Sequence, residues 1–195
     1  SNKSPMIETM PIGDGITNPY GITKMICEQL VDDCAKDDWA VLLLRYFNPI
    51  GNPVNGIPEN PSFPPENLMP NIINAATGKI DSLNIYGTDY DTIDGTCERD
   101  FIHIDDLVEG HVKALDYVLS NTFVYEAINL GTGIPHTVLE LIETFETCNN
   151  IEINKNFCDK RPGDIKTSYC NAEKAECILG WKANKTLTDM CSNYT

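Results

Sequence analysis

The chain has 195 residues, of which 42% are hydrophobic and 22% are charged, a composition typical of a globular protein rather than of a disordered one. Its 29 acidic residues against 14 basic ones give a net charge of -15, so we expect neither nucleic acid nor an anionic membrane surface as a partner. No apolar run approaches the roughly 20 residues that a membrane span needs, and we expect no signal peptide, because the first residues are polar.

The eight cysteines show no CxxC spacing, which argues against zinc and thioredoxin-type chemistry. A disulfide-stapled secreted scaffold would be shorter and would carry an export signal. We therefore expect reduced thiols, many of them packed in the core, and a cytoplasmic protein.

The first expected element is a helix from Pro19 to about Lys36. Asn18 can cap this helix through its side-chain oxygen, and Pro19 suits the first helical position, where no N–H is needed. Tyr20 and Lys24 are four residues apart and therefore share one helix face. A phenol beside an ammonium can transfer protons, because the positive charge favours the phenolate. On spacing alone, such a Tyr and Lys are more often a solvated surface pair.

Residues 39–47 form an almost continuous apolar run, which is typical of a parallel strand buried on both faces. Asn48 follows this strand, at the edge where open α/β sheets bind ligands, although an Asn before a proline is also an ordinary start of a turn. Residues 51–66 are rich in proline and predict a long loop. A helix is then expected from Asn67 to about Ala76.

A short strand is expected at 82–86, in which Tyr86 is suited either to stack on a nucleobase or to pack in the core. The acidic loop 89–94 lacks the ligand order of a calcium loop, and we expect no metal there. The next strand is expected at 100–104, with Arg99 just before it. Both Arg99 and Arg161 offer planar donors for phosphate, or an ion pair with a neighbouring aspartate.

The second half of the chain alternates helices with strands. We expect helices at 107–119, 137–147 and 172–179, strands at 124–130 and 151–157, and the start of a helix at 187–194. His103 and Asp105 are placed at a strand end and a helix start, and Asp106 has capping-box spacing to Glu109. Gly131-Thr132-Gly133 follows a strand, but position 136 is His, so the third glycine of a dinucleotide-binding turn is missing.

Several of these segments occur together in one known family. They are Asn18–Lys24, Leu42–Gly51, Asn67–Pro70, Tyr86–Thr96, Arg99–Leu107, Asn129–Gly133 and Arg161–Asp164. In this order, from about Pro11 to Met190, they closely resemble the UDP-glucose 4-epimerase family of extended short-chain dehydrogenases/reductases. The Tyr-x-x-x-Lys spacing is shared by the whole superfamily, whereas the block 86–96 is much more specific.

The resemblance implies an α/β fold with two parts. Residues 1–50 would form the end of a Rossmann-type parallel sheet with the Tyr/Lys helix, and residues 51–195 a smaller mixed α/β substrate-binding domain, of which 97–133 partly returns to the Rossmann sheet. The family carries its NAD-binding βαβ units upstream of the Tyr/Lys helix. We therefore expect those units to be absent from this chain, which would correspond to the C-terminal part of a homodimeric enzyme and be inactive by itself.

The resemblance also implies an activity, the reversible, NAD-dependent inversion at C4 of UDP-galactose and UDP-glucose. Tyr20 would remove the 4-hydroxyl proton, Lys24 would hold the nicotinamide ribose, and Phe47 would lie against the nicotinamide. The residues that the resemblance places at the UDP-hexose are Asn48, Asn67, Leu68, Asn84, Ile85, Tyr86, Arg99, Arg161, Asp164 and Ser168. Ser168 stands where the family gates its sugar pocket, and a small residue there predicts that UDP-GlcNAc and UDP-GalNAc are accepted too.

Two alternatives stay open on the sequence. Another nucleotide-sugar enzyme of the superfamily, such as a dehydratase or a decarboxylase, would share Tyr20 and Lys24, although the block 86–96 argues against it. A non-catalytic nucleotide-sugar-binding module would keep the same binding residues without using NAD.

Overall fold

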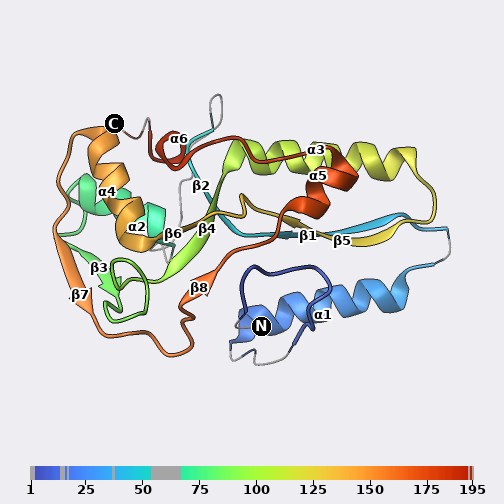
Figure 1. The fold of residues 1–195 in the computed structure, drawn as a ribbon, viewed down its shortest axis with the longest axis horizontal. Coiled ribbons are helices and arrows are strands. Elements are labelled where there is room, and N and C mark those ends of the chain that lie inside the picture. Colours follow the sequence, from blue (N-terminus) through green and yellow to red (C-terminus); the bar gives the residue numbers. More distant parts are fainter. Residues whose placement is uncertain are drawn as a thin grey trace.

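The structure is a computed structural model that describes residues 3–13, 16, 18–36, 38–53, 67–192 and 194 (Figure 1). Most of the loop predicted at 51–66 lies outside these residues. The helices are α1 (Pro19–Cys34), α2 (Leu68–Ala76), α3 (Ile104–Ser120), α4 (Val138–Asn149), α5 (Glu173–Leu179) and α6 (Leu187–Cys191). The strands are β1 (Val41–Tyr46), β2 (Asn48–Ile50), β3 (Leu83–Tyr86), β4 (Glu98–His103), β5 (Tyr125–Leu130), β6 (Pro135–Thr137), β7 (Lys155–Cys158) and β8 (Thr167–Ser168). No helix within these ranges is long and apolar enough to cross a membrane.

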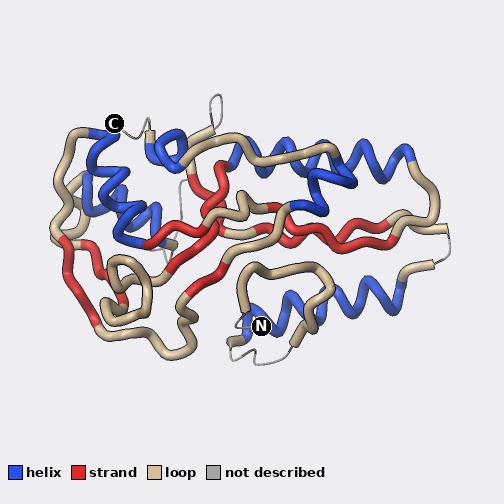
Figure 2. The backbone as a smooth tube through the Cα atoms, viewed as in Figure 1, coloured by secondary structure: helices blue, strands red, loops and turns tan. Residues whose placement is uncertain are grey.

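The strands form three small sheets (Figure 2). β1 pairs with β5, β3 pairs with β7, and β4 lies between β2 and β6 with β8 alongside. Every pairing is parallel except that of β4 with β6. In Figure 1, α1 lies on one side of the β1–β5 pair, and α3 and α5 lie on the other. The fold is therefore α/β, as expected.

Strand β4 joins two hydrophobic cores. Successive side chains of a strand point to opposite faces, so Phe101 packs in one core and Ile102 in the other. The first core also contains Ile72 of α2 and Phe145 of α4. The second is centred on Trp181, whose indole N–H donates to the carbonyl of Asp106 at 3.1 Å. The residues next to β4 are consequently fixed by packing from both sides.

The helix ends follow the residues that the sequence provides. Asn18 caps α1 by accepting from the backbone N–H of Gly21 at 2.7 Å, with Pro19 as the first helical residue. Thr137 and Glu140 form the reciprocal capping box that opens α4. Gly180 ends α5 with a φ of 60°, in the left-handed region that glycine adopts without strain. The capping role predicted for Asn18 is confirmed.

The burial expected for the strand at 39–47 is wrong. β1 is parallel to β5, as predicted, but its residues are half-buried or exposed rather than buried on both faces. Within the described ranges its second edge has no partner strand, and α1, which flanks it, contains no buried residue. The link between the two elements is polar, because Arg45 of β1 donates to both carboxylate oxygens of Glu28 of α1 at 2.8 and 2.6 Å.

The start of α3 also differs from the prediction. The helix begins at Ile104, directly after β4, so Asp106 lies inside its first turn and is not the N-cap. His103 fills that position, and its ring Nδ1 accepts from the N–H of Asp105 at 3.0 Å. Asp106 instead accepts from the backbone N–H groups of Asn184 and Lys185 at 3.0 and 2.8 Å. Its carboxylate therefore links α3 to the segment that contains Asn184 and Lys185.

All eight cysteines are free; three are buried, three are exposed and two are half-buried. Burial raises the pKa of Cys191 to about 12, and it raises that of Cys170 well above the ordinary thiol range, with the Asp100 carboxylate adding to the effect. We expect iodoacetamide to alkylate the exposed thiols of Cys27, Cys34 and Cys177 in the native protein, because the thiolate is the nucleophile. Cys170 and Cys191 should react only after denaturation, and peptide mass mapping of both samples checks this. Native labelling of Cys191 would contradict it.

Candidate functional site

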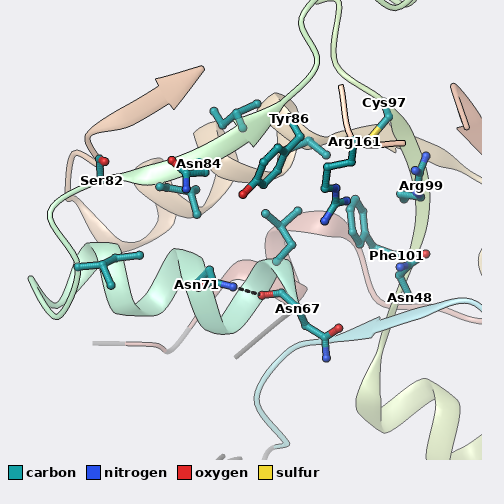
Figure 3. A pocket seen from close by; sticks show the side chains of 15 residues that line it. Asn48, Asn67, Asn71, Ser82, Asn84, Tyr86, Cys97, Arg99, Phe101 and Arg161 are labelled. Atoms are coloured by element: carbon teal, nitrogen blue, oxygen red, sulfur yellow. Dashed lines mark hydrogen bonds between the residues drawn. The ribbon is translucent and has the colours of Figure 1, made fainter. Parts of the chain in front are cut away.

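A cavity of about 630 Å³ opens between β3, the start of α2 and β4 (Figure 3). Its lining residues come from six separate segments of the chain. They are Asn48, Asn67, Leu68, Asn71, Ile80, Ser82, Leu83, Asn84, Ile85, Tyr86, Cys97, Arg99, Phe101, Val138 and Arg161. Eight of the ten residues expected at the UDP-hexose are among them, all except Asp164 and Ser168.

The alternation of β3 explains how this strand contributes to the cavity. Leu83 and Ile85 are buried in the core, which leaves Asn84 and Tyr86 on the open face. In Figure 3 both side chains project from β3 toward the space above α2. The Tyr86 ring remains 37% exposed, so an aromatic face is available for a planar ligand.

The two arginines in the cavity are held in different ways. Arg99 lies within β4, not before it as predicted, and its Nη1 donates to the carbonyls of Glu98 and Ile165 at 2.8 and 2.9 Å. Arg161 comes from a turn, and its guanidinium lies over the Tyr86 ring at 4.8 Å from the centroid. The Arg99 side chain is 17% exposed and that of Arg161 54%. Arg99 is therefore held by backbone carbonyls, whereas the more exposed Arg161 is held by Asp164 and the Tyr86 ring.

Asp164 stands between the two guanidinium groups. Its Oδ2 lies 2.9 Å from Nε of Arg161, and its Oδ1 lies 4.0 Å from Nη2 of Arg99. Of the two ion pairs considered for these arginines, Arg161–Asp164 is present. Arg99 does not pair with Asp100, because neighbours in a strand point to opposite faces. Two cations that share one carboxylate leave a net positive charge in a chain of net charge -15, which suits a diphosphate.

Ser168 and Asn48 are brought to this site by the neighbours of β4. Ser168 in β8 is paired in register with Arg99, and Asn48 in β2 is paired with Phe101. Ser168 is half-buried, and it follows Thr167, whose hydroxyl donates to Glu98 at 2.7 Å. Ser168 is therefore held beside Arg99, although the two residues are far apart in sequence.

The predicted catalytic pair lies on one face of α1. The ammonium nitrogen of Lys24 is 5.2 Å from the centroid of the Tyr20 ring, and the Tyr20 side chain is 71% exposed. Neither residue lines the 630 Å³ cavity, and neither does Phe47, whose backbone N–H donates to Leu130 at 3.2 Å. A phenol and an ammonium side by side are suitable donors for the hydroxyls of a ribose.

The turn Gly131-Thr132-Gly133 cannot receive a pyrophosphate. The backbone N–H groups of Thr132 and Gly133 donate to the buried Asp100 carboxylate at 2.9 and 3.0 Å. A Cβ on Gly131 would lie 2.7 Å from the same carboxylate. The backbone N–H groups of this turn therefore bind an internal anion instead of a ligand.

The sequence interpretation missed several lining residues. Asn71 lies one helical turn after Asn67, whose carbonyl accepts from its amide at 2.8 Å. Ser82 precedes Asn84 by two positions, on the same face of the extended chain. Both could have been found from the periods of a helix and a strand. Cys97 and Phe101 could not, because their position at the cavity depends on how β4 packs. Within the described ranges no group of three His, Cys, Asp or Glu side chains could hold a metal ion.

Comparison with known proteins places the chain in a family. Residues 1–131 match the NAD dependent epimerase/dehydratase family. The chain is 47% identical to the UDP-glucose 4-epimerase of Bacillus subtilis (strain 168) over 97% of its own length and 56% of that protein. It is 45% identical to the Drosophila melanogaster UDP-glucose 4-epimerase, with 97% and 55% covered. The chain thus spans about half the length of these relatives.

Solved structures give the same result. The Bifidobacterium longum UDP-glucose 4-epimerase in complex with NAD+ and UDP superimposes with a TM-score of 0.91 at 42% identity, over 98% of this chain and 57% of that one. The UDP-Glc/GlcNAc 4-epimerase of Campylobacter jejuni superimposes with a TM-score of 0.76 at 32% identity, over 97% and 57%. The chain belongs to the NAD dependent epimerase/dehydratase family.

Proposed function

We propose that this chain is the UDP-sugar-binding and proton-transferring part of an NAD-dependent epimerase that interconverts UDP-galactose and UDP-glucose at C4. The observation that carries the proposal is the cavity of about 630 Å³ in which two guanidinium groups, an exposed aromatic ring and asparagine amides converge. A nucleoside diphosphate needs the same three kinds of partner: cations for the phosphates, a ring to stack on the base, and amides for polar edges.

The proposed binding mode distributes the ligand over the cavity. The base lies between Tyr86 and the start of α2, near Asn84 and Leu68. Arg161 leaves Asp164 to bind the diphosphate, whereas Arg99 binds the diphosphate in its present position. Asn67, at the start of α2, and Ile85, in β3, complete the nucleotide site. The sugar then extends toward Asn48 and Ser168, which offer it few strong contacts. The hexose can therefore rotate and present its opposite face to the cofactor while the nucleotide stays bound.

Proton transfer is assigned to α1. Tyr20 removes the proton of the sugar 4-hydroxyl and later returns it, and Lys24 donates to the ribose of the cofactor. NAD supplies the acceptor and donor of the C4 hydride. Phe47 is proposed to lie against the nicotinamide. Because Tyr20 is 71% exposed here, this surface needs a cover to exclude water during the reaction.

We propose that the cover is the remaining NAD-binding part of the family fold, in a polypeptide longer than these residues. The relatives are nearly twice as long as the chain, and the open edge of β1 is a place where a parallel sheet continues. In this proposal 1–50 ends a Rossmann-type sheet, 97–133 partly returns to it, and the rest of 51–195 binds the substrate. The isolated chain then binds nucleotide but has no epimerase turnover, and the enzyme acts as a cytoplasmic homodimer.

The first test is the binding of UDP to the 195-residue chain by isothermal titration calorimetry. We expect Arg161→Ala to weaken UDP binding about 10- to 100-fold, because a charge-assisted bidentate contact is worth about 1.5–3 kcal/mol. Its thermal unfolding should change little, since the side chain is 54% exposed. Lys182→Ala is the control, because it removes one positive charge at a site 67% exposed and outside the cavity lining. A wild-type chain that does not bind UDP would refute the site.

The second test concerns the sugar. We expect the full-length enzyme to interconvert UDP-GlcNAc and UDP-GalNAc as well as the unacetylated pair, because the Ser168 side chain is small and half-buried beside Arg99. Ser168→Tyr should abolish turnover of the acetylated pair and preserve that of UDP-galactose, measured by chromatography of the products. Wild-type activity on UDP-glucose with none on the acetylated pair would contradict the prediction.

A non-catalytic nucleotide-sugar-binding module is the second candidate. It is favoured by one observation, that Tyr20 and Lys24 are exposed and do not line the cavity. For such a module UDP would stabilise the full-length protein against heat, but no NAD would copurify and no UDP-galactose would be converted.

A further inference from the structure

The open face of the β3–β7 pair carries more than the residues predicted from the sequence. The two strands are parallel, and their register aligns Asn84 with Asn156 and Tyr86 with Cys158. Aligned residues in neighbouring strands project from the same face. Asn156 and Cys158 are therefore direct neighbours of the two cavity residues on β3, although neither of them lines the cavity.

Hydrogen bonds give the Asn84 amide a defined orientation. Its Oδ1 accepts from Nδ2 of Asn156 at 2.7 Å and faces the Cys158 thiol at 3.7 Å. Asn156 is itself held by a contact from its Nδ2 to the Cys158 sulfur at 3.5 Å. The oxygen of Asn84 is thus occupied on the β7 side, while its Nδ2 has no hydrogen-bond partner within the described ranges. Figure 3 shows that nitrogen on the side of Asn84 that faces α2 across the cavity.

We propose that Asn156 is a positioning residue that selects the base of the nucleotide by holding the Asn84 amide with its N–H donors toward the cavity. This inference rests on the proposed function, because it presupposes a nucleotide whose base lies beside Asn84. A donor at this place pairs with a carbonyl oxygen on the base edge and leaves an amino group unpaired. Uracil carries a carbonyl where cytosine carries an amino group. The arrangement therefore favours a uridine over a cytidine nucleotide.

The polarity of the pair can be reversed at Asn156 without touching the cavity. Asn156→Asp replaces the donor by acceptors, so the Asn84 amide should rotate, give its N–H to the new carboxylate, and turn its oxygen toward the base. Asn156→Lys keeps a donor at that place and should leave the orientation unchanged. The two variants change the charge in opposite directions, so a general electrostatic effect on the diphosphate moves UDP and CDP together and cancels in the ratio of their affinities.

The experiment is a calorimetric titration of UDP and of CDP into the wild-type chain and both variants. We expect the wild type to prefer UDP by about tenfold, and Asn156→Asp to lower this preference at least about fivefold, as one gained or lost hydrogen bond allows. Asn156→Lys should keep the wild-type preference within about twofold, well under the change of one such bond. All three proteins should unfold at similar temperatures, because Asn156 is exposed.

The outcomes separate the two proposals. If the wild type prefers UDP and Asn156→Asp retains the same preference, Asn156 does not orient Asn84 and only this inference fails. A shift in Asn156→Lys equal to that in Asn156→Asp would overturn it as well, because polarity would then not be the cause. A wild type that binds neither nucleotide refutes the proposed function, and the inference with it.

Discussion

Tyr20→Phe in the full-length enzyme is expected to lower the rate of UDP-galactose conversion by about 10²- to 10⁴-fold, the usual contribution of a positioned general acid–base group. The change removes one hydroxyl from a residue that is 71% exposed, so neither folding nor the 630 Å³ cavity should be affected. UDP affinity should remain at the wild-type value. A loss of rate with binding retained would locate the chemistry on α1 and the nucleotide at the cavity.

Tyr117→Phe is the matched control for this prediction. It removes the same hydroxyl from α3, where Tyr117 packs against the second core, and should leave the rate unchanged. Conversion would be followed by coupling the UDP-glucose formed to its dehydrogenase. A Tyr20→Phe enzyme that keeps more than about a tenth of the wild-type rate would show that another group transfers the proton.

Asp100→Ala is expected to lower the free energy of unfolding by about 3–5 kcal/mol, because it leaves several buried N–H donors without an acceptor, each at a cost of about 1–3 kcal/mol. Asp100 is fully buried and accepts from the Thr132 hydroxyl at 2.7 Å and from the N–H groups of Thr132, Gly133 and Cys170 at 2.9, 3.0 and 3.3 Å. Alanine leaves the three backbone N–H groups without this acceptor. Since native domains are stable by only about 5–15 kcal/mol, a substantial unfolded fraction should appear.

Urea denaturation followed by circular dichroism measures this loss. Asp116→Ala is the control, because this aspartate is exposed on α3 and its removal should change stability by less than about 0.5 kcal/mol. Asp100→Asn should be intermediate, since the amide keeps one acceptor but opposes the backbone donors with a donor of its own. A loss below about 1 kcal/mol in Asp100→Ala would mean that the turn does not depend on its internal anion.

Local signals in the sequence were sufficient for the helices and the longer strands, whereas most of the cavity residues were expected from the resemblance to the family. Asn18, Thr137 and Gly180 mark helix ends through hydrogen bonds and backbone angles that involve only nearby residues. The strands at 41–46 and 83–86 follow from apolar residues and their alternation. The sequence predictions Asn84, Tyr86, Arg99 and Arg161 do meet in one cavity.

Other properties depend on contacts between distant residues and were beyond the sequence. The strand predicted at 151–157 forms only at 155–158, where it can pair with β3. Strand β1 is not buried on both faces, because no described strand pairs with its second edge and α1 contributes no buried residue beside it. Asp106 was expected to cap a helix, but the helix begins two residues earlier, at Ile104. The Asp106 carboxylate instead accepts from the N–H groups of Asn184 and Lys185, nearly eighty positions away.

The sequence by itself therefore determined the helices, the longer strands and the shared helix face of Tyr20 and Lys24, because these depend on periodicity, whereas the residues expected at the nucleotide came mainly from the resemblance to the family. The tertiary structure decided which of them meet and how they are oriented. It placed the Asp164 carboxylate between two arginines and the Asp100 carboxylate against the backbone N–H groups of the turn after β5. It also placed the Asn156 amide within hydrogen-bond distance of Asn84. Such contacts follow from strand register and packing, which no local pattern encodes.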